Sequence, residues 1–208
     1  MSVTEVRHPL VRHKLGLLRD VETSTEMFRR LVIELTLLLT YEATKEMSLE
    51  DVDVQTPLEW TKAQRIPGKK VAVCPILRAG MGMIDGVLSL IPVARVGFIG
   101  LYRNEETLEP VEYYVKLPAD IAEREVLLLD PMLATGNSTA AAVAILKRAG
   151  AQHITLIALI AAPEGVERVV RDHPDVRIVV ASIDSHLNEK GYIVPGLGDA
   201  GDRLYGTK

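Results

Sequence analysis

The sequence predicts an α/β protein whose parallel sheet carries helices on both faces. Three observations lead to this fold class. Between about residues 70 and 184, short runs of β-branched and apolar residues alternate with segments of helical pattern. The strand-like runs are apolar throughout, which is typical of strands buried on both faces. With 208 residues, of which 48% are hydrophobic, the chain is long enough for one good-sized core and short for two.

Charge and cysteine content narrow the function classes. The net charge is -4 and the lysines and arginines are scattered, so no basic face exists for a nucleic-acid backbone. The single cysteine, Cys74, excludes an internal disulfide framework, and no Cys/His cluster has zinc-site spacing. The N-terminus lacks a signal-peptide pattern, and the apolar runs are too short to span a membrane. We expect a soluble cytoplasmic protein without nucleic-acid or membrane partners.

The first predicted element is a helix from Thr23 to about Lys45, with Thr23 or Ser24 as the N-cap. Its middle is apolar over more than one stripe, so it is either sandwiched inside the fold or buried against a second subunit. We favour the contact with a second subunit. Residues 52–58 have the pattern of a strand or loop, and Trp60 is expected to be a packed anchor.

The remaining elements follow the alternation described above. Basic Lys147 and Arg148 lie in the last turn of one helix, which ends at Gly150. In parallel sheets, ligands bind beyond the carboxyl ends of the strands. Strands are expected at 70–76, 94–103, 126–130, 153–161 and 176–184, and helices at 81–90, 138–150 and 163–173.

Two segments fall outside the alternation. Residues 104–118 contain four glutamates and Pro110 between two strand-like pieces, which indicates an exposed hairpin or a mobile loop. Residues 186–208 are rich in glycine, and we expect no regular element there.

The stretch VLLLDPMLATGNST, residues 126–139, combines a buried strand, an aspartate at its end, a small turn and a helix start. A helix N-terminus is an anion site, and small residues let a phosphate approach the backbone, with hydroxyls from Thr135, Ser138 and Thr139. No lysine lies in the turn, so it is not a nucleotide-triphosphate loop. Asp130 suits neutral hydroxyls, such as those of a ribose. The alternative, equally weighted, is a turn whose Ser or Thr only caps the helix.

A second motif is CPILRAGMGMIDG, residues 74–86. Gly80, Gly82 and Gly86 nearly form the dinucleotide fingerprint, but Asp85 stands where the third glycine belongs. Arg78 at the end of a strand suits a second anion, held by its guanidinium and by backbone N–H groups. The alternative is a surface arginine that caps a loop.

A third motif, GLGDAG at 196–201, is a literal GxGxxG, but it follows Pro195 and precedes only seven residues. No βαβ unit can be completed, so a dinucleotide site is rejected. Asp199 and Asp202 in this stretch indicate a backbone wrapped around a small ligand; a solvated tail is the alternative. The five histidines are dispersed, and Cys74 is interpreted as a small buried strand residue.

Together these motifs resemble the type I phosphoribosyltransferases, and specifically the uracil phosphoribosyltransferase family. Residues 126–138 resemble its phosphoribosyl-pyrophosphate (PRPP) motif, in which the uracil enzymes carry Asp-Pro, here Asp130 and Pro131. Residues 74–83 resemble its pyrophosphate loop, and residues 191–207 its uracil-binding segment. One departure is Asn137, where a second glycine is expected.

The resemblance covers almost the whole chain and implies one domain, 1–208: a helical arm at about 1–50, a core at about 68–184 and a base-binding hood at 185–208. The fold implied is the parallel-sheet type I phosphoribosyltransferase fold, with 104–118 as a lid hairpin.

The resemblance also assigns residue roles. The turn from Ala134 to Ser138 would hold the 5-phosphate, and Asp130 the ribose hydroxyls. Uracil would be bound by backbone groups of Ile193, Gly198, Asp199 and Ala200. The implied catalytic residues are Asp130, Arg78 and Asp199. The implied PRPP contacts are Arg78, Arg103, Asp130, Pro131, Met132, Leu133, Ala134, Thr135, Gly136, Asn137, Ser138 and Asp199.

The reaction implied by the resemblance is uracil plus PRPP to UMP plus pyrophosphate, a step of pyrimidine salvage. Mg2+ is the expected cofactor, held through PRPP oxygens and water and not by protein side chains. GTP activates some members of the family and is therefore a candidate effector, and a homodimer or larger homo-oligomer is expected. The alternatives are a nucleotide-sensing, RNA-binding regulator of the same fold and a phosphoribosyltransferase for another base.

Overall fold

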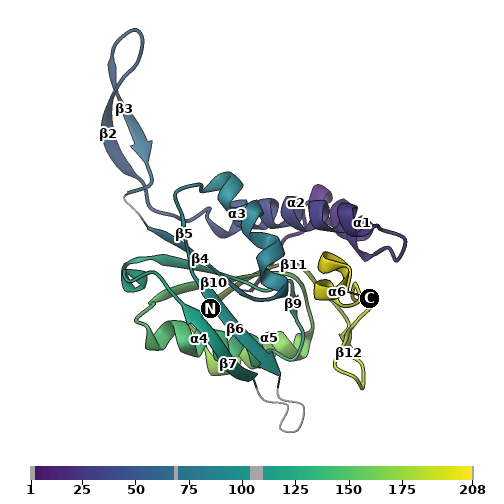
Figure 1. The fold of residues 1–208 in the computed structure, drawn as a ribbon. Helices are drawn as coiled ribbons and strands as arrows, with labels where there is room; N and C mark the ends of the chain where they lie inside the picture. The colour runs from purple at the N-terminus through teal and green to yellow at the C-terminus, as the bar shows by residue number, and fades with distance from the viewer. Residues whose placement is uncertain (1–2, 68–69, 104–109, 208) are drawn as a thin grey trace.

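A mostly parallel sheet forms the centre of the molecule (Figure 1). The computed structural model describes residues 3–67, 70–103 and 110–207. The main strands lie in the order β1-β11-β10-β8-β4-β6-β7, and all neighbours are parallel except β6 and β7. Their bounds are β1 Val3–Glu5, β4 Val71–Leu77, β6 Phe98–Arg103, β7 Pro110–Lys116, β8 Glu125–Leu129, β10 His153–Ala161 and β11 Arg177–Ile183. The predicted fold class is confirmed.

Helices cover both faces of this sheet (Figure 1). Helices α1 (Pro9–Arg19), α2 (Thr25–Ala43) and α3 (Ile84–Leu90) lie on one face, and α4 (Asn137–Arg148) and α5 (Pro163–Asp172) on the other. Strand β4 shows why its residues are apolar in succession: Val71 and Val73 belong to the core under α2, whereas Ala72, Cys74 and Ile76 belong to the core under α4. None of the helices in the described residues is both long and apolar enough to span a membrane.

The strand expected at 94–103 is divided into β5 (Arg95–Val96) and β6. The division falls at Gly97, whose N–H donates to the carbonyl of Val73 over 2.9 Å. A Cβ on Gly97 would lie 3.1 Å from the carbonyl oxygen of Lys116, so glycine permits the close approach of β7. Similarly, a short 3-10 helix, η1 (Ala79–Met83), precedes α3 where one helix was expected.

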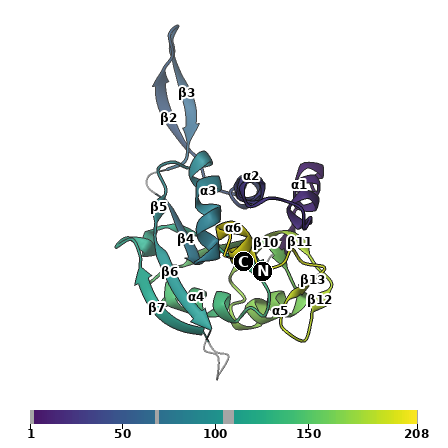
Figure 2. The same ribbon diagram turned by 45° about the vertical axis from the view of Figure 1, so that its right-hand side comes forward.

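Helix α2 begins after Ser24, whose hydroxyl accepts from the N–H of Met27, as the sequence predicts. Figure 2 shows α2 end-on between α1 and α3, above the sheet. Its inward side chains, among them Phe28, Leu35 and Leu39, are fully buried within the chain. Packing inside the fold therefore accounts for the broad apolar pattern, and the favoured contact with a second subunit stays a prediction.

The expectation that Trp60 is a packed anchor is wrong. Trp60 is 66% exposed and lies near the tip of a hairpin, β2 (Glu50–Gln55) and β3 (Trp60–Arg65), that projects from the body (Figure 1). The hydrophobicity of one aromatic residue does not reveal that its whole supersecondary unit leaves the core. Helix α1 has no counterpart among the predicted elements.

The expectation of no regular element at the C-terminus is also wrong. The hood contains a short pair of strands, β12 (His186–Leu187) and β13 (Ile193–Val194), and helix α6 (Ala200–Tyr205). Its glycines serve the turns between these elements: Gly196, Gly198 and Gly206 have positive φ values of 67°, 80° and 67°. Asp199 caps α6 through a 2.9 Å hydrogen bond from the N–H of Asp202.

The proposed lid is described in part. Strand β7 pairs antiparallel with β6, in agreement with the hairpin alternative, while residues 104–109 lie outside the described residues.

Replacing Gly86 by alanine should lower the free energy of unfolding by about 1 to 3 kcal/mol, because the pocket for a side chain is already filled. A Cβ there would lie 2.6 Å from the carbonyl oxygen of Ile33 and 2.7 Å from Thr36 Cβ, which would force α3 away from α2. Urea unfolding followed by circular dichroism measures the effect. The matched control is Gly16→Ala in α1, where a Cβ meets nothing within 4 Å; it should stabilise the protein by about 0.5 to 1 kcal/mol. Equal effects of the two substitutions would contradict this packing analysis.

Candidate active site

The three sequence motifs meet at the carboxyl edge of the sheet, around a cavity of about 600 Å³ that we call the carboxyl-edge cavity. Arg78 follows β4, Asp130 follows β8, and Asp199 comes from the hood. Because parallel strands end at the same edge, residues far apart in the sequence become neighbours here. The full lining is Ile76, Leu77, Arg78, Ala79, Leu101, Tyr102, Tyr113, Asp130, Pro131, Met132, Ser138, Asp199 and Gly201.

Asp130 is partly enclosed at the end of β8, and its carboxylate accepts hydrogen bonds from two donors. Its Oδ1 accepts from the N–H of Met132 over 3.2 Å, and its Oδ2 from the hydroxyl of Thr139 over 3.5 Å. Burial raises the pKa of Asp130 from 3.8 to about 6, and these two hydrogen bonds oppose the shift. Asp130 is therefore ionised at neutral pH and can accept hydrogen bonds from neutral hydroxyls in the cavity.

The turn from Ala134 to Ser138, the phosphate turn, is shaped by two close backbone approaches. Gly136 has a φ of 78°, and a Cβ there would lie 2.8 Å from the carbonyl oxygen of Gly165. A Cβ on Gly165 would in turn lie 2.3 Å from the carbonyl oxygen of Ala134. Helix α5 therefore supports the turn from behind, and α4 begins within the turn, at Asn137. The first N–H groups of α4 have no acceptor inside the helix, and that of Asn137 donates to Thr135 Oγ1 over 3.4 Å. The supporting role of Gly165 was missed because the sequence does not show that α5 packs here.

Asn137 does not obstruct the phosphate turn. Its Oδ1 accepts a hydrogen bond from Arg168 Nη1 of α5 over 3.0 Å, so its side chain lies against α5. The same guanidinium donates to Asp172 through Nε. The departure from the expected glycine thus adds a contact between the turn and α5.

In the loop after β4, close packing leaves no room for side chains at Gly80 and Gly82. A Cβ on Gly80 would lie 2.5 Å from the carbonyl oxygen of Leu129, and one on Gly82 would lie 2.8 Å from the side chain of Leu204. The hydroxyl of Tyr205 donates to the carbonyl of Arg78 over 2.9 Å, which joins this loop to the hood. The Arg78 side chain is exposed at the cavity.

The predicted site residues divide into four groups. Arg78, Asp130, Pro131, Met132, Ser138 and Asp199 line one cavity. Within the hood, Ile193 and Ala200 are buried, Gly198 is exposed, and the Asp199 carboxylate caps α6. Arg103 is the last residue of β6, and its side chain lies outside what the structure describes. The remaining predicted residues form the adjoining turn: Leu133, Ala134, Thr135, Gly136 and Asn137.

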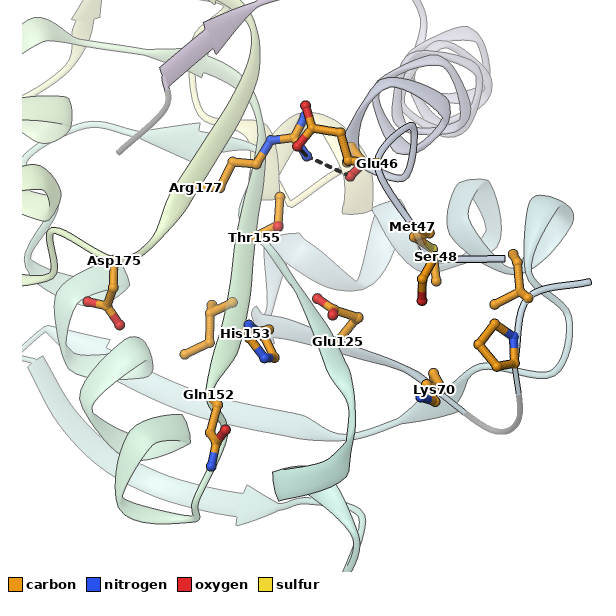
Figure 3. Close-up of a pocket in the computed structure, with 14 residues that line it drawn as sticks. Glu46, Met47, Ser48, Lys70, Glu125, Gln152, His153, Thr155, Asp175 and Arg177 are labelled. Carbon is orange, nitrogen blue, oxygen red and sulfur yellow. Dashed lines mark hydrogen bonds and ion pairs between the residues drawn. The ribbon is translucent and has the colours of Figure 1, made fainter. Parts of the chain in front are cut away.

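A second cavity, of about 400 Å³, lies at the opposite edge of the sheet, where β8, β10 and β11 begin (Figure 3). We call it the amino-edge pocket. Glu125 and His153 are neighbours on paired strands there, and Arg177 is engaged with the carbonyls of Ala43 and Glu42. The amino-edge pocket has charges of both signs, Glu46, Glu125 and Asp175 beside Lys70 and Arg177. The carboxyl-edge cavity adjoins the start of α4, whose dipole favours an anion, and is therefore the better candidate for an anionic substrate.

Comparison with known proteins identifies relatives over the full length. Residues 5–207 match the family model described as "Uracil phosphoribosyltransferase". A protein of that name from Clostridium botulinum (strain Eklund 17B / Type B) is 61% identical over 207 residues, covering 100% of this chain and 99% of the relative. A solved structure of the AQ2163 protein from Aquifex aeolicus has a TM-score of 0.93 at 41% identity, covering 98% of this chain and 97% of the other. An adenine phosphoribosyl transferase from Trypanosoma brucei shares the fold, with a TM-score of 0.58 at 13% identity over 95% of this chain and 87% of the other.

The Asp130→Asn variant should be more stable than the parent at neutral pH. The folded parent retains a proton on Asp130 between pH 3.8 and about 6, whereas the unfolded chain releases it. The parent therefore loses stability relative to the variant as pH rises through that window. Above it the variant should be more stable by about 1 to 3 kcal/mol, since one pKa unit corresponds to about 1.4 kcal/mol. Thermal unfolding at about pH 4 and about pH 8 measures this difference; a variant less stable at the higher pH would make Asp130 a structural residue.

The Asn137→Gly variant should retain the affinity of the parent for PRPP within about threefold, because the side chain faces Arg168. It should lose about 0.5 to 1 kcal/mol of stability through the lost hydrogen bond and the added backbone freedom. Calorimetric titration with PRPP measures the first effect and urea unfolding the second. A tenfold change in affinity would mean that Asn137 contacts the ligand.

Proposed function

Because this chain belongs to the uracil phosphoribosyltransferase family, we propose that the carboxyl-edge cavity is where uracil and PRPP react to give UMP and pyrophosphate. The enzyme is a pentosyltransferase of pyrimidine salvage. The observation that carries the proposal is the convergence of Arg78, Asp130 and Asp199, one from each motif, around a single cavity.

In the proposed complex, the 5-phosphate of PRPP lies on the phosphate turn. The start of α4 supports this role because its first N–H groups have no acceptor within the helix and its dipole favours an anion. Asp130 then accepts hydrogen bonds from the ribose hydroxyls, which suits a carboxylate ionised at neutral pH. Arg78 and Arg103 bind the pyrophosphate, since guanidinium groups match phosphate oxygens in pairs.

The proposed reaction displaces pyrophosphate from C1 of the ribose by N1 of uracil. Positive charge grows on the ribose as the bond to the leaving group breaks, and negative charge grows on the departing pyrophosphate. Arg78 and Arg103 therefore stabilise the transition state more than the bound substrate. Asp199 and Asp130, both at the cavity, place negative charge near the developing cation.

Uracil is proposed to bind to the backbone of Ile193, Gly198, Asp199 and Ala200. Its edge presents a carbonyl, an N–H and a second carbonyl, and main-chain donors and acceptors can match that order. Cytosine reverses part of it. A buried polar group left unmatched costs about 1 to 3 kcal/mol, or roughly one to two orders of magnitude in binding.

We also propose Mg2+ as the cofactor. The Asp130 and Asp199 carboxylates at the cavity can accept hydrogen bonds from water bound to the ion, and no group of three or more His, Cys, Asp and Glu side chains in the described ranges is arranged to hold an ion directly. These groups fit a Mg2+ ion that keeps substrate oxygens and water as its main ligands. When bound, Mg2+ supplies charge neutralisation at the pyrophosphate.

A homodimer or larger homo-oligomer is proposed as well. The hairpin β2–β3 projects from the body and carries Val52 and Val54 on one of its faces, opposite Ala63 and Thr61. An isolated two-stranded hairpin is marginally stable in water, which supports its packing on a second copy of the chain. The proposed location is the cytoplasm, where the free thiol of Cys74 stays reduced. GTP stays a candidate effector on the precedent of the family alone.

The two alternatives are less well supported. A phosphoribosyltransferase for another base conflicts with 61% identity to a relative named for uracil. An RNA-binding regulator conflicts with a net charge of -4.

The purified protein with uracil, PRPP and Mg2+ should form UMP and pyrophosphate, which liquid chromatography separates and measures. Replacing uracil by cytosine should lower the rate at least about tenfold, because the N3 acceptor and the 4-amino donor of cytosine both face groups that match uracil. Removing Mg2+ with EDTA should abolish turnover, and added Mg2+ should restore it. Formation of a nucleotide from a purine, or a shift of RNA in a gel without UMP formation, would favour one of the alternatives.

A further inference from the structure

The base-binding backbone of the hood is held by side chains from the opposite end of the chain. We propose that Arg19 and Asp184 are positioning residues for uracil: as an ion pair they fix the backbone of Gly196, and with it the main-chain groups that bind the base. This inference rests on the proposed function. It adds two residues that contact neither substrate and that no motif of the sequence indicated.

The ion pair binds both the backbone N–H and the backbone carbonyl of Gly196. Asp184 Oδ2 accepts from the N–H of Gly196 over 2.9 Å, and Arg19 Nη1 donates to the carbonyl of Gly196 over 2.6 Å. Arg19 also binds Asp184 through two parallel hydrogen bonds, Nη1 to Oδ2 at 2.7 Å and Nη2 to Oδ1 at 2.5 Å. Such bidentate pairs fix orientation as well as distance. The position of Gly196 is therefore determined by α1 on one side and by the end of β11 on the other.

Gly196 lies within the segment that has to match uracil. It stands between Ile193 and Gly198, and its φ is 67°. A Cβ there would lie 2.1 Å from the carbonyl oxygen of Ile193, so the two backbones are in direct contact. A movement of Gly196 would therefore move the base-binding groups on both sides of it.

A second arginine ties the hood to the same end of α1 in the opposite direction. Arg203 of α6 donates to the carbonyls of Leu18 and Asp20, at 2.8 and 2.5 Å, and to the carbonyl of Leu197 at 2.9 Å. Its guanidinium lies 4.4 Å from the ring centre of Phe28. Each of the two parts thus contributes one arginine that donates to backbone carbonyls of the other: Arg19 of α1 to the hood, and Arg203 of the hood to the end of α1.

The surroundings make the ion pair strong. The side chain of Asp184 is 2% exposed and that of Arg19 is 22% exposed, so water competes little for either. Burial raises the pKa of Asp184, but hydrogen bonds from Arg19, the Gly196 N–H and the Ser182 hydroxyl outweigh it, and the net pKa is lowered. Asp184 therefore stays ionised wherever the enzyme is folded near neutral pH.

The consequence is selective for the base. Apart from Asp199, the proposed PRPP contacts come from the ends of β4, β6 and β8 and from the turn before α4, all of which belong to the central sheet and its helices. The hood consists of the short strands β12 and β13 and helix α6, and Ile193, Leu197, Ala200 and Leu204 anchor it in the core. Between these anchors, the position of its backbone depends on the hydrogen bonds of Arg19 and Asp184. Loosening Gly196 should weaken uracil recognition and leave PRPP binding in place.

The test compares Arg19→Met and the milder Arg19→Lys with the parent, in steady-state assays that vary uracil and PRPP separately. We expect Arg19→Met to raise KM for uracil at least about tenfold and to change KM for PRPP less than about twofold, since hydrogen bonds to charged groups shift equilibria by one to two orders of magnitude. Arg19→Lys should recover part of the loss, because lysine can donate to one acceptor but not to both in parallel. Asp184→Asn should resemble Arg19→Met, since an amide NH2 replaces one carboxylate oxygen, so one of the two parallel bonds from Arg19 and the charge of the pair are lost.

The matched controls are Arg124→Met and Asp120→Asn. Arg124 forms a similar bidentate pair with Asp120 and also donates to a strand carbonyl, that of Val71, but it lies at the amino edge of the sheet. These variants should lose stability without changing the ratio of the two KM values. A merely structural role for Arg19 predicts the same result for Arg19→Met, and that result would overturn the proposal.

Amide hydrogen exchange gives a readout independent of activity. Residues 193–200 should exchange faster in Arg19→Lys and Asp184→Asn than in the parent, while residues 126–139 should not. If the parent makes no UMP, the proposed function fails, and the exchange data still decide whether the ion pair holds the hood. Unchanged exchange at 193–200 would overturn the proposal even in an active enzyme.

Discussion

The common carboxyl edge of the parallel strands is the constraint on which the site depends. Strands β4 and β8 run side by side in the same direction, so Arg78 and Asp130, one residue beyond each, lie at one cavity. Both faces of the sheet are covered by helices, which leaves the edges as the places open to a ligand. The amino edge has a pocket of mixed charge, whereas the carboxyl edge has a helix N-terminus suited to phosphate.

Close contact between backbones then shapes that edge. Gly80 meets the end of β8, and Gly136 and Gly165 allow α5 to touch the phosphate turn. Each contact requires the absence of a side chain. These glycines are therefore needed for close packing of the backbones, and not only for the backbone angle φ. The hood is joined to the body both by packing, through Ile193, Leu197, Ala200 and Leu204, and by hydrogen bonds of Arg19, Arg203 and Tyr205.

The sequence predicted the parts of the structure that are periodic or local. The apolar strands, the helix after Ser24 and the aspartate before a small turn are all visible in short windows of sequence. Trp60 was misjudged because the exposure of a whole hairpin depends on tertiary arrangement. Helix α6 was missed although its cap is local, since Asp199 accepts from the N–H of Asp202; the surrounding glycines favoured an irregular segment. Arg19 could not be connected with Gly196, because no local pattern shows that residues so distant in the chain share a hydrogen bond. Asn137 departs from the expected glycine, and the sequence does not show that its side chain bonds to Arg168.

A crystal structure of the protein with UMP bound tests directly whether the carboxyl-edge cavity is the active site. We expect the phosphate on the amides of residues 134–138, the ribose hydroxyls on Asp130, and the base against the backbone of residues 193 and 198–200. UMP in the amino-edge pocket, or a base bound by side chains away from the hood, would contradict the central claim that one carboxyl-edge cavity holds both substrates.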